Sequence, residues 1–226
     1  MASSIDRATT FCSRFGLRVP ILLAPMAGAS ATSLSVAVAG AGGLGACGAV
    51  LMQPDEIANW AAKVRAGGAE TFQMNLWIPD PAPSRDPDHE ARVRDLLAGW
   101  GPLVPPEAGD ATPPDFALQC EALLSVKPPA VSSVMGLYPP EFVAKLKQRG
   151  IIWLANITTV VEARAAEAAG ADVIVAQGME AGGHRGSFDA AAAERSQVGL
   201  FSLVPAVVDA VSAPVVATGG IADGRV

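Results

Sequence analysis

Short apolar segments alternate with alanine-rich segments of helical length along most of this 226-residue chain. An apolar run of about four to eight residues is typical of a buried strand, and regular alternation with helices is typical of βα units around a parallel sheet. The chain contains seven such runs, at residues 20–24, 43–47, 71–77, 130–135, 151–156, 172–177 and 214–218. The sequence therefore predicts an α/β fold built on a parallel sheet.

Local signals place the ends of three helices. Pro54 lies near the first turn of one helix. Pro140 opens a second helix that Gly150 closes, and Thr159 and Glu162 have the spacing of a capping box. Proline is favoured at the first helical position and glycine just beyond the last one, while a capping box satisfies unpaired backbone N–H groups. We therefore expect these residues to mark helix boundaries.

Residues 40–45 match the dinucleotide-binding pattern G-x-G-x-x-G, but their context is inverted. That fingerprint needs a strand before it and a helix after it, whereas here a helical stretch at 30–39 precedes it and a strand follows. We interpret these glycines as a helix-to-strand turn. A P-loop and a Gly-x-Ser-x-Gly elbow are also missing from the sequence, so nucleoside triphosphatase and serine hydrolase functions are not expected.

Composition excludes several classes of partner. The net charge is −6 and the Lys and Arg residues are scattered, so we expect no nucleic-acid binding. Three cysteines and two histidines lack the spacing of a zinc site or a disulfide framework, so we expect no metal and a reducing compartment. No uncharged apolar run reaches membrane-spanning length, and residues 1–16 lack the apolar core of a signal peptide. The sequence predicts a cytoplasmic protein that acts on small molecules and avoids membranes.

Residues 79–114 interrupt the regular pattern, because this segment holds half of the eighteen prolines. It follows the end of a predicted strand, and long loops in compact domains are often functional. Two interpretations stay open: a lid over the site, or a long surface excursion. His89 lies in this polar stretch, where we expect a solvated side chain.

The carboxyl ends of the predicted strands carry small residues, backbone groups and amides. These strand ends are residues 24–28, 75–77, 177–178 and 217–220. In parallel α/β barrels these ends converge on one face and build the active site. Few charges and many unhindered N–H groups suit a flat polar ring system with a phosphate tail better than a metal. Gly219 and Gly220 occupy the usual phosphate corner.

Residues 177–186 follow an apolar strand and form a glycine-rich loop that carries His184, one of the two histidines. A histidine of this kind can be held by loop hydrogen bonds alone. Its flanking glycines and its place at a strand end favour a catalytic role instead. An imidazole, whose ordinary pKa is ~6.5, can bind an anion or remove a proton near neutral pH.

Five motifs occur in order along nearly the whole chain: PILLAPMAG (20–28), AGGLG (41–45), NLWIP (75–79), QGMEAGGHRG (177–186) and ATGGIADGR (217–225). Together they resemble the nitronate monooxygenase family, formerly called 2-nitropropane dioxygenase. The resemblance implies a TIM-type (β/α)8 barrel that binds FMN. It also implies oxidation of alkyl nitronates, such as propionate 3-nitronate, by O2 to carbonyl compounds and nitrite.

The resemblance also implies roles for individual residues. The expected cofactor-binding residues are Ala24, Pro25, Met26, Asn75, Gln177, Gly182, Gly183, Gly219 and Gly220. Residues 24–26 would line the flavin ring, and the two amides would bond its polar edge or ribityl chain. Residues 182–183 would let the backbone approach, and 219–220 would hold the phosphate. The amides of Asn75 and Gln177 can alternatively satisfy loop backbone.

His184 is expected to be the catalytic residue, close to the nitro group of the substrate. It would orient an anionic nitronate and remove the α-proton of a neutral nitroalkane. Arg185 could add positive potential or form a salt bridge beneath the loop, and we assign it no catalytic role. Glu180 is expected only to fix the loop. Two alternatives remain: a flavin-dependent enoyl-acyl-carrier-protein reductase that uses NADH, and a catalytically inactive flavin barrel.

The chain ends at Val226, where the helix after the seventh strand should begin. We therefore expect residues 1–226 to form one FMN-binding barrel domain that is truncated after the seventh strand and lacks the eighth strand and the C-terminal helical segment. The first and seventh strands would then be exposed edges, which invite pairing with another chain. A truncated form or fragment of a longer enzyme, or closure of the sheet by a partner chain or a swapped segment, would account for this. A homodimer is also left open.

Overall fold

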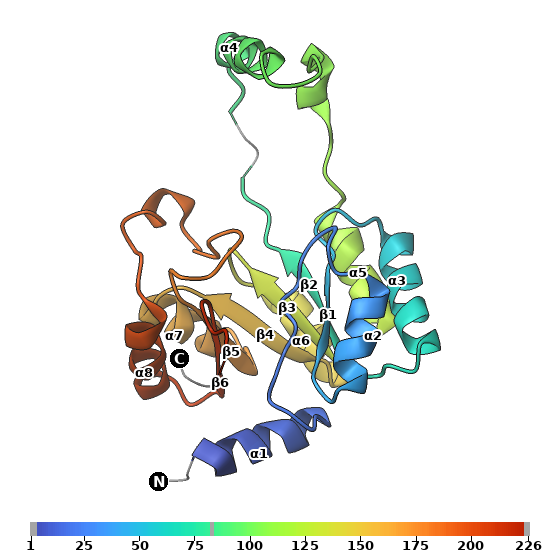
Figure 1. Ribbon diagram of the computed structural model, residues 1–226, viewed down its shortest axis with the longest axis vertical. Coiled ribbons are helices and arrows are strands. Elements are labelled where there is room, and N and C mark those ends of the chain that lie inside the picture. The colour runs from blue at the N-terminus through green and yellow to red at the C-terminus, as the bar shows by residue number, and fades with distance from the viewer. Residues whose placement is uncertain (1–3, 82–83, 224–226) are drawn as a thin grey trace.

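The computed structural model describes residues 4–81 and 84–223, and contains a parallel sheet of six strands between helices (Figure 1). The strands are β1 (Gly45–Gly48), β2 (Phe72–Trp77), β3 (Ala130–Val134), β4 (Ile152–Ile157), β5 (Val173–Gln177) and β6 (Val215–Thr218). The helices are α1 (Ser4–Phe15), α2 (Thr32–Gly40), α3 (Pro54–Ala66), α4 (Pro87–Ala98), α5 (Phe116–Val126), α6 (Pro140–Arg149), α7 (Val160–Ala168) and α8 (Leu200–Ala210), with short 3-10 helices η1 (Pro106–Asp110) and η2 (Ala190–Ala192). The predicted α/β fold with a parallel sheet is confirmed. Residues 224 and 225 of the last motif lie outside the described residues.

The strands pair in the order in which they occur along the chain, from β1 to β6, and every pairing is parallel. The sheet is curled, and helices cover its outer face (Figure 1). Sequential parallel pairing needs a crossover after each strand, and the intervening helices provide it. All six carboxyl ends therefore lie at one edge of the sheet.

The expected first strand, residues 20–24, is not a full strand. It makes only an isolated bridge to Leu44, the residue before β1, in which Leu44 N–H donates to the Ile21 carbonyl (3.0 Å) and Leu23 N–H donates to the Leu44 carbonyl (2.9 Å). The next donor in this register would be residue 25, and Pro25 has no N–H, so the ladder is interrupted there. The prediction of seven strands was therefore wrong for residues 20–24, and the described sheet has six strands.

The hydrophobic core has two parts, one on each face of the sheet. The larger lies between the sheet and its covering helices and includes Trp153, Phe72 and Leu146. The smaller lies on the concave face and includes Leu44, Leu154 and residues of α1. Figure 1 shows α1 crossing below the amino ends of the strands. Side chains alternate between faces along a strand, so both faces of these strands are apolar, as in other parallel sheets with both faces covered.

The predicted helix boundaries are confirmed. Helix α3 begins at Pro54, and α6 begins at Pro140 and is followed by Gly150 in a left-handed conformation (φ 68°). At the start of α7, Glu162 N–H donates to Thr159 Oγ1 (3.2 Å), and Thr159 N–H donates to the Glu162 carboxylate (3.1 Å). Residues 40–45 join α2 to β1, which confirms the helix-to-strand turn.

Residues 79–114, here called the arm, project from the body beyond the carboxyl end of β2 (Figure 1). Within the arm, Arg85 pairs with Glu90 and donates to Asp110 (2.8 Å) and to the Gly109 carbonyl (3.0 Å). Helix α4 buries none of its residues, and His89 is exposed as expected. Residues 82 and 83 lie outside the described part. Both interpretations of the arm, a lid and a surface excursion, stay predictions.

Among the described residues, no helix is both long enough and apolar enough to span a membrane. The three cysteines are buried and unpaired. Burial raises the pKa of the Cys47 thiol from its ordinary 9.0 to about 12. Burial, followed by the charge of Glu121, raises the pKa of the Cys120 thiol to about 12 as well.

These thiols should be inert in the folded protein. In a Cys12→Ser background, we expect Ellman's reagent to label neither Cys47 nor Cys120 at pH 8 until guanidinium unfolds the chain, because only the thiolate reacts. Their raised pKa values stabilise the fold below about pH 9, and this contribution is lost as the pH rises toward 12. Urea titrations should therefore give a falling free energy of unfolding above about pH 9. Rapid labelling of the native protein at pH 8 would contradict this.

Candidate active site

A row of polar side chains crosses the concave face near the carboxyl ends of the strands. Asn75 on β2 lies opposite Ser132 on β3, and Gln177 on β5 lies opposite Thr218 on β6. Asn156 on β4 lies between them and donates through Nδ2 to Gln177 Oε1 (3.4 Å). The apolar concave core therefore gives way to amides and hydroxyls at this edge.

Sequence reasoning selected Asn75 and Gln177 from this row but missed Ser132 and Asn156. The missing signal was the alternation of side chains along a strand. Asn156 lies two residues after Leu154, whose side chain belongs to the concave core, so both point to the same face. In the same way, Ser132 lies two residues after Ala130, whose side chain also belongs to the concave core.

The Asn75 side chain is buried and already bonded. Its Nδ2 donates to Ser132 Oγ (3.0 Å) and to the Ser132 carbonyl (3.2 Å). This amide therefore ties β2 to β3. Its expected contact with a flavin stays a prediction.

Gln177 holds the loop that follows its own strand. Its Nε2 donates to the His184 carbonyl (3.0 Å), and its Oε1 accepts from Gly186 N–H (2.7 Å). These bonds pin the backbone on both sides of residue 185. These bonds use one of the two protons of the Gln177 Nε2 amide. Contact of this amide with a cofactor stays a prediction.

His184 is exposed at the same edge of the sheet. Its ring packs edge-on against Trp77, the last residue of β2, with centroids 4.6 Å apart and an interplanar angle of 64°. In the described part of the chain, no hydrogen bond to its imidazole nitrogens is found. The β5 loop thus reaches across to β2 and presents an imidazole that is available to a ligand.

Arg185 turns beneath the loop and binds backbone carbonyls. Its guanidinium donates to the carbonyls of Gln177 (3.2 Å), Ser196 (3.3 Å) and Thr158 (3.5 Å). Within the described residues it forms no ion pair, so the salt bridge considered from the sequence was wrong. Loop carbonyls near the strand ends need donors, and a five-donor guanidinium supplies several at once.

Glu180 fixes the loop, as the sequence predicted. Its two carboxylate oxygens accept from Leu200 N–H at 2.9 and 3.1 Å. Leu200 begins α8, where unpaired N–H groups and the helix dipole favour a carboxylate. The loop is therefore anchored to α8 as well as to β5.

Residues 24–28 lie against the carboxyl end of β1. A side chain at Gly48 would place its Cβ 2.5 Å from the Ala27 nitrogen, so only glycine permits this approach. Ala24 and Met26 are exposed, and Met26 N–H donates to Ser30 Oγ (2.8 Å). Gly48 pairs with Asn75 and with Ala27, so it lies between this segment and Asn75.

The glycines after β5 and β6 differ in their surroundings. Gly219 and Gly220 have φ values of 117° and 70°, and a Cβ at Gly219 would lie 2.9 Å from the Ala181 nitrogen. The turn after β6 therefore rests on the β5 loop. At Gly182 and Gly183 a Cβ would meet no atom within 4 Å. Their backbone is open to a ligand.

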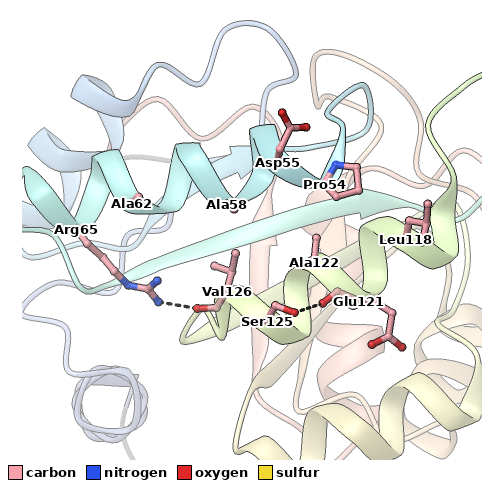
Figure 2. A pocket seen from close by; sticks show the side chains of 10 residues that line it. All are labelled: Pro54, Asp55, Ala58, Ala62, Arg65, Leu118, Glu121, Ala122, Ser125 and Val126. Atoms are coloured by element: carbon pink, nitrogen blue, oxygen red, sulfur yellow. Dashed lines mark hydrogen bonds between the residues drawn. The ribbon is translucent and has the colours of Figure 1, made fainter.

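A surface groove on the outer layer lies away from these residues. It has a volume of about 710 Å³ and runs between α3 and α5 on the outer layer, where small residues such as Ala58, Ala62 and Ala122 form its floor (Figure 2). A second groove, of about 300 Å³, lies beside α7 and segment 187–196. Neither contains the strand-end residues, because that edge faces an open side of the curled sheet. We place the candidate site by its chemistry and not by volume.

The motif order and this geometry agree with a family match. Residues 10–226 match the model of the family described as nitronate monooxygenase. The chain belongs to the nitronate monooxygenase family. This is a family of flavin-dependent oxidoreductases.

Individual relatives support this membership. A nitronate monooxygenase from Paraburkholderia phytofirmans is 39% identical over 221 residues, which cover 92% of this chain and 58% of the relative. A crystal structure of nitroalkane oxidase from Streptomyces ansochromogenes has a TM-score of 0.80 and 36% identity over 94% of this chain and 61% of that one. A mutant of FabK from Thermotoga maritima has a TM-score of 0.71 and 28% identity, covering 96% and 58%. The chain spans about three-fifths of the length of these relatives.

Two glycines of the loop should respond differently to alanine. At Gly186 a Cβ would lie 2.1 Å from Asn156 Nδ2 and 2.9 Å from Val134 Cγ2, whereas at Gly182 it would meet nothing within 4 Å. We expect Gly186→Ala to lower the free energy of unfolding by about 1–3 kcal/mol. Gly182→Ala should change it by less than about 0.5 kcal/mol. Denaturant titration measures both, and equal losses would argue against this packing.

Proposed function

We propose that this chain carries the site of an FMN-dependent nitronate monooxygenase. Such an enzyme oxidises alkyl nitronates of the propionate 3-nitronate type with O2 to a carbonyl compound and nitrite. The observation that supports this most directly is the exposed His184 imidazole, held at the carboxyl edge of a parallel sheet in a chain of this family. The same likeness supports the inference that the six strands belong to a TIM-type (β/α)8 barrel.

The residues present fit a flavin. The open backbone of Gly182 and Gly183 permits close approach of a ring system, and the positive φ values of Gly219 and Gly220 suit a turn whose N–H groups would bind a phosphate. Residues 24–26 would line the ring, and Asn75 and Gln177 would face its polar parts. The flavin, when bound, supplies the redox chemistry. We propose FMN as this flavin because the family resemblance implies it.

His184 would act on the substrate. A nitronate is an anion, so a hydrogen bond from the imidazole to a nitro oxygen would orient it. For a neutral nitroalkane, the same imidazole would accept the α-proton. Trp77 packs against the ring and limits its rotation. The apolar face of the indole also excludes water from that side.

A flavin-dependent enoyl reductase remains the second candidate. The likeness to FabK supports it, at lower identity than the likeness to nitroalkane oxidase. A barrel that binds flavin without turnover is the third. One pair of assays separates all three.

We expect flavin-loaded protein to release nitrite from propionate 3-nitronate under O2. His184→Asn should lower turnover on the order of a hundredfold, because it removes a general base and an anion donor, while flavin content stays near that of the parent. His89→Asn, in the exposed arm, is the matched control. NADH oxidation with a crotonyl thioester and no nitrite would favour the reductase instead. Equal losses of flavin and turnover in His184→Asn would indicate a structural role.

A further inference from the structure

The Glu162 carboxylate accepts five hydrogen bonds, and its two oxygens serve two different segments. Oε2 accepts from Thr158 N–H (2.6 Å), Thr158 Oγ1 (2.8 Å) and Thr159 N–H (3.1 Å), which closes the start of α7. Oε1 accepts from Phe188 N–H (2.8 Å) and Ser187 Oγ (3.3 Å). The capping box explains the first set only.

The second set lies in the loop that carries His184. Before His184, the backbone at Gly182 and Gly183 is exposed and makes no close packing contact. After it, Ser187 is buried and Phe188 packs against the core. His184 therefore lies between an open glycine pair and a fixed segment. The position of His184 depends on the bond from Gln177 to its carbonyl and on how firmly that segment is held.

We propose that Glu162 is a positioning residue for His184. By holding Ser187 and Phe188, its carboxylate fixes the loop on the far side of Arg185 and keeps the imidazole against Trp77. The inference rests on the proposed function in one respect, namely that His184 acts on the substrate. The positional effect itself is independent of flavin and substrate.

The chain provides a matched control on the same helix. Glu167 also belongs to α7, and one of its oxygens accepts from Ser212 N–H (2.7 Å) and Ala213 N–H (2.9 Å). It therefore ties a loop to α7 by the same chemistry, but the loop leads into β6 and not to His184. A Glu167 variant therefore shows the effect of losing a carboxylate from α7. A Glu162 variant also loses the contact with the loop that carries His184.

The test uses Glu162→Gln and Glu167→Gln. A glutamine has a single amide oxygen, and we expect it to stay with the three donors at the start of α7. The amide NH2 then faces Phe188 N–H, donor against donor, and the bond to Phe188 is lost, while Ser187 Oγ can still accept from the NH2. Ser187→Ala removes one loop bond and leaves the cap intact, so it decides the matter if Glu162→Gln does not fold.

Carbon–proton NMR spectra of the imidazole groups report the position without any cofactor. The chain has two histidines, and His89 is the exposed reference. The indole of Trp77 should shift the His184 resonances, and Glu162→Gln should move them toward those of His89. Ser187→Ala should move them in the same direction but less, and Glu167→Gln should leave them in place. Unmoved resonances in folded Glu162→Gln, or equal movement in both glutamate variants, would overturn the proposal.

Turnover provides the second readout. In flavin-loaded protein, Glu162→Gln should lower kcat for nitrite release on the order of tenfold to a hundredfold, with unchanged flavin content, because a displaced catalytic group costs rate. Glu167→Gln should retain the parental kcat. If no variant, including the parent, releases nitrite, the proposed function fails while the NMR result still decides the positioning role. If nitrite is released equally by all, the positioning role fails.

Discussion

Sequential parallel pairing is the constraint on which the candidate site depends. Because each strand pairs with the next one along the chain, all six carboxyl ends lie at one edge. The hydrogen-bond register then aligns Asn75 with Ser132 and Gln177 with Thr218. A slip of one residue in any strand would turn its polar side chain from the concave face to the outer core. The chemistry of the edge therefore follows from backbone pairing before any loop is considered.

The β5 loop illustrates how a long irregular segment can hold one side chain in place. Gln177 on β5 and Glu162 on α7 accept from its backbone N–H groups, and the Arg185 guanidinium donates to backbone carbonyls. The Glu180 carboxylate ties the loop to the first N–H of α8. Buried backbone N–H and C=O groups must find partners, and here polar side chains provide them. Because those demands are met without the His184 imidazole, this side chain is left to face solvent. An exposed side chain on a pinned backbone is the arrangement that a binding or catalytic role requires.

Local signals predicted the parts of this fold that local forces determine. The starts of α3, α6 and α7 followed from prolines and a capping box, which act within one helical turn. Residues 20–24 were predicted to be a strand because their side chains are apolar, although Pro25 removes an N–H group that the pairing needs. A salt bridge was one of two roles considered for Arg185, since a sequence gives no sign that carbonyl oxygens will surround a guanidinium. The contact of His184 with Trp77 joins residues far apart in the chain and required the strand order. The polar row likewise became complete only once the register showed which residues share a face.

The arm should tolerate more changes in sequence and length than the rest of the chain. Helix α4 contributes no buried residue, Trp100 is 86% exposed, and the Arg85 ion cluster is formed within the arm itself. The packing of the sheet and its helices therefore draws little support from these residues. Substitutions, length changes or an inserted reporter domain should be tolerated here far better than in the β5 loop, where Gly178 and Gly186 have no room for a side chain. Sequence divergence among related chains is thus expected to concentrate in the arm, and the same segment is the natural place to engineer a handle that leaves the strand-end edge intact.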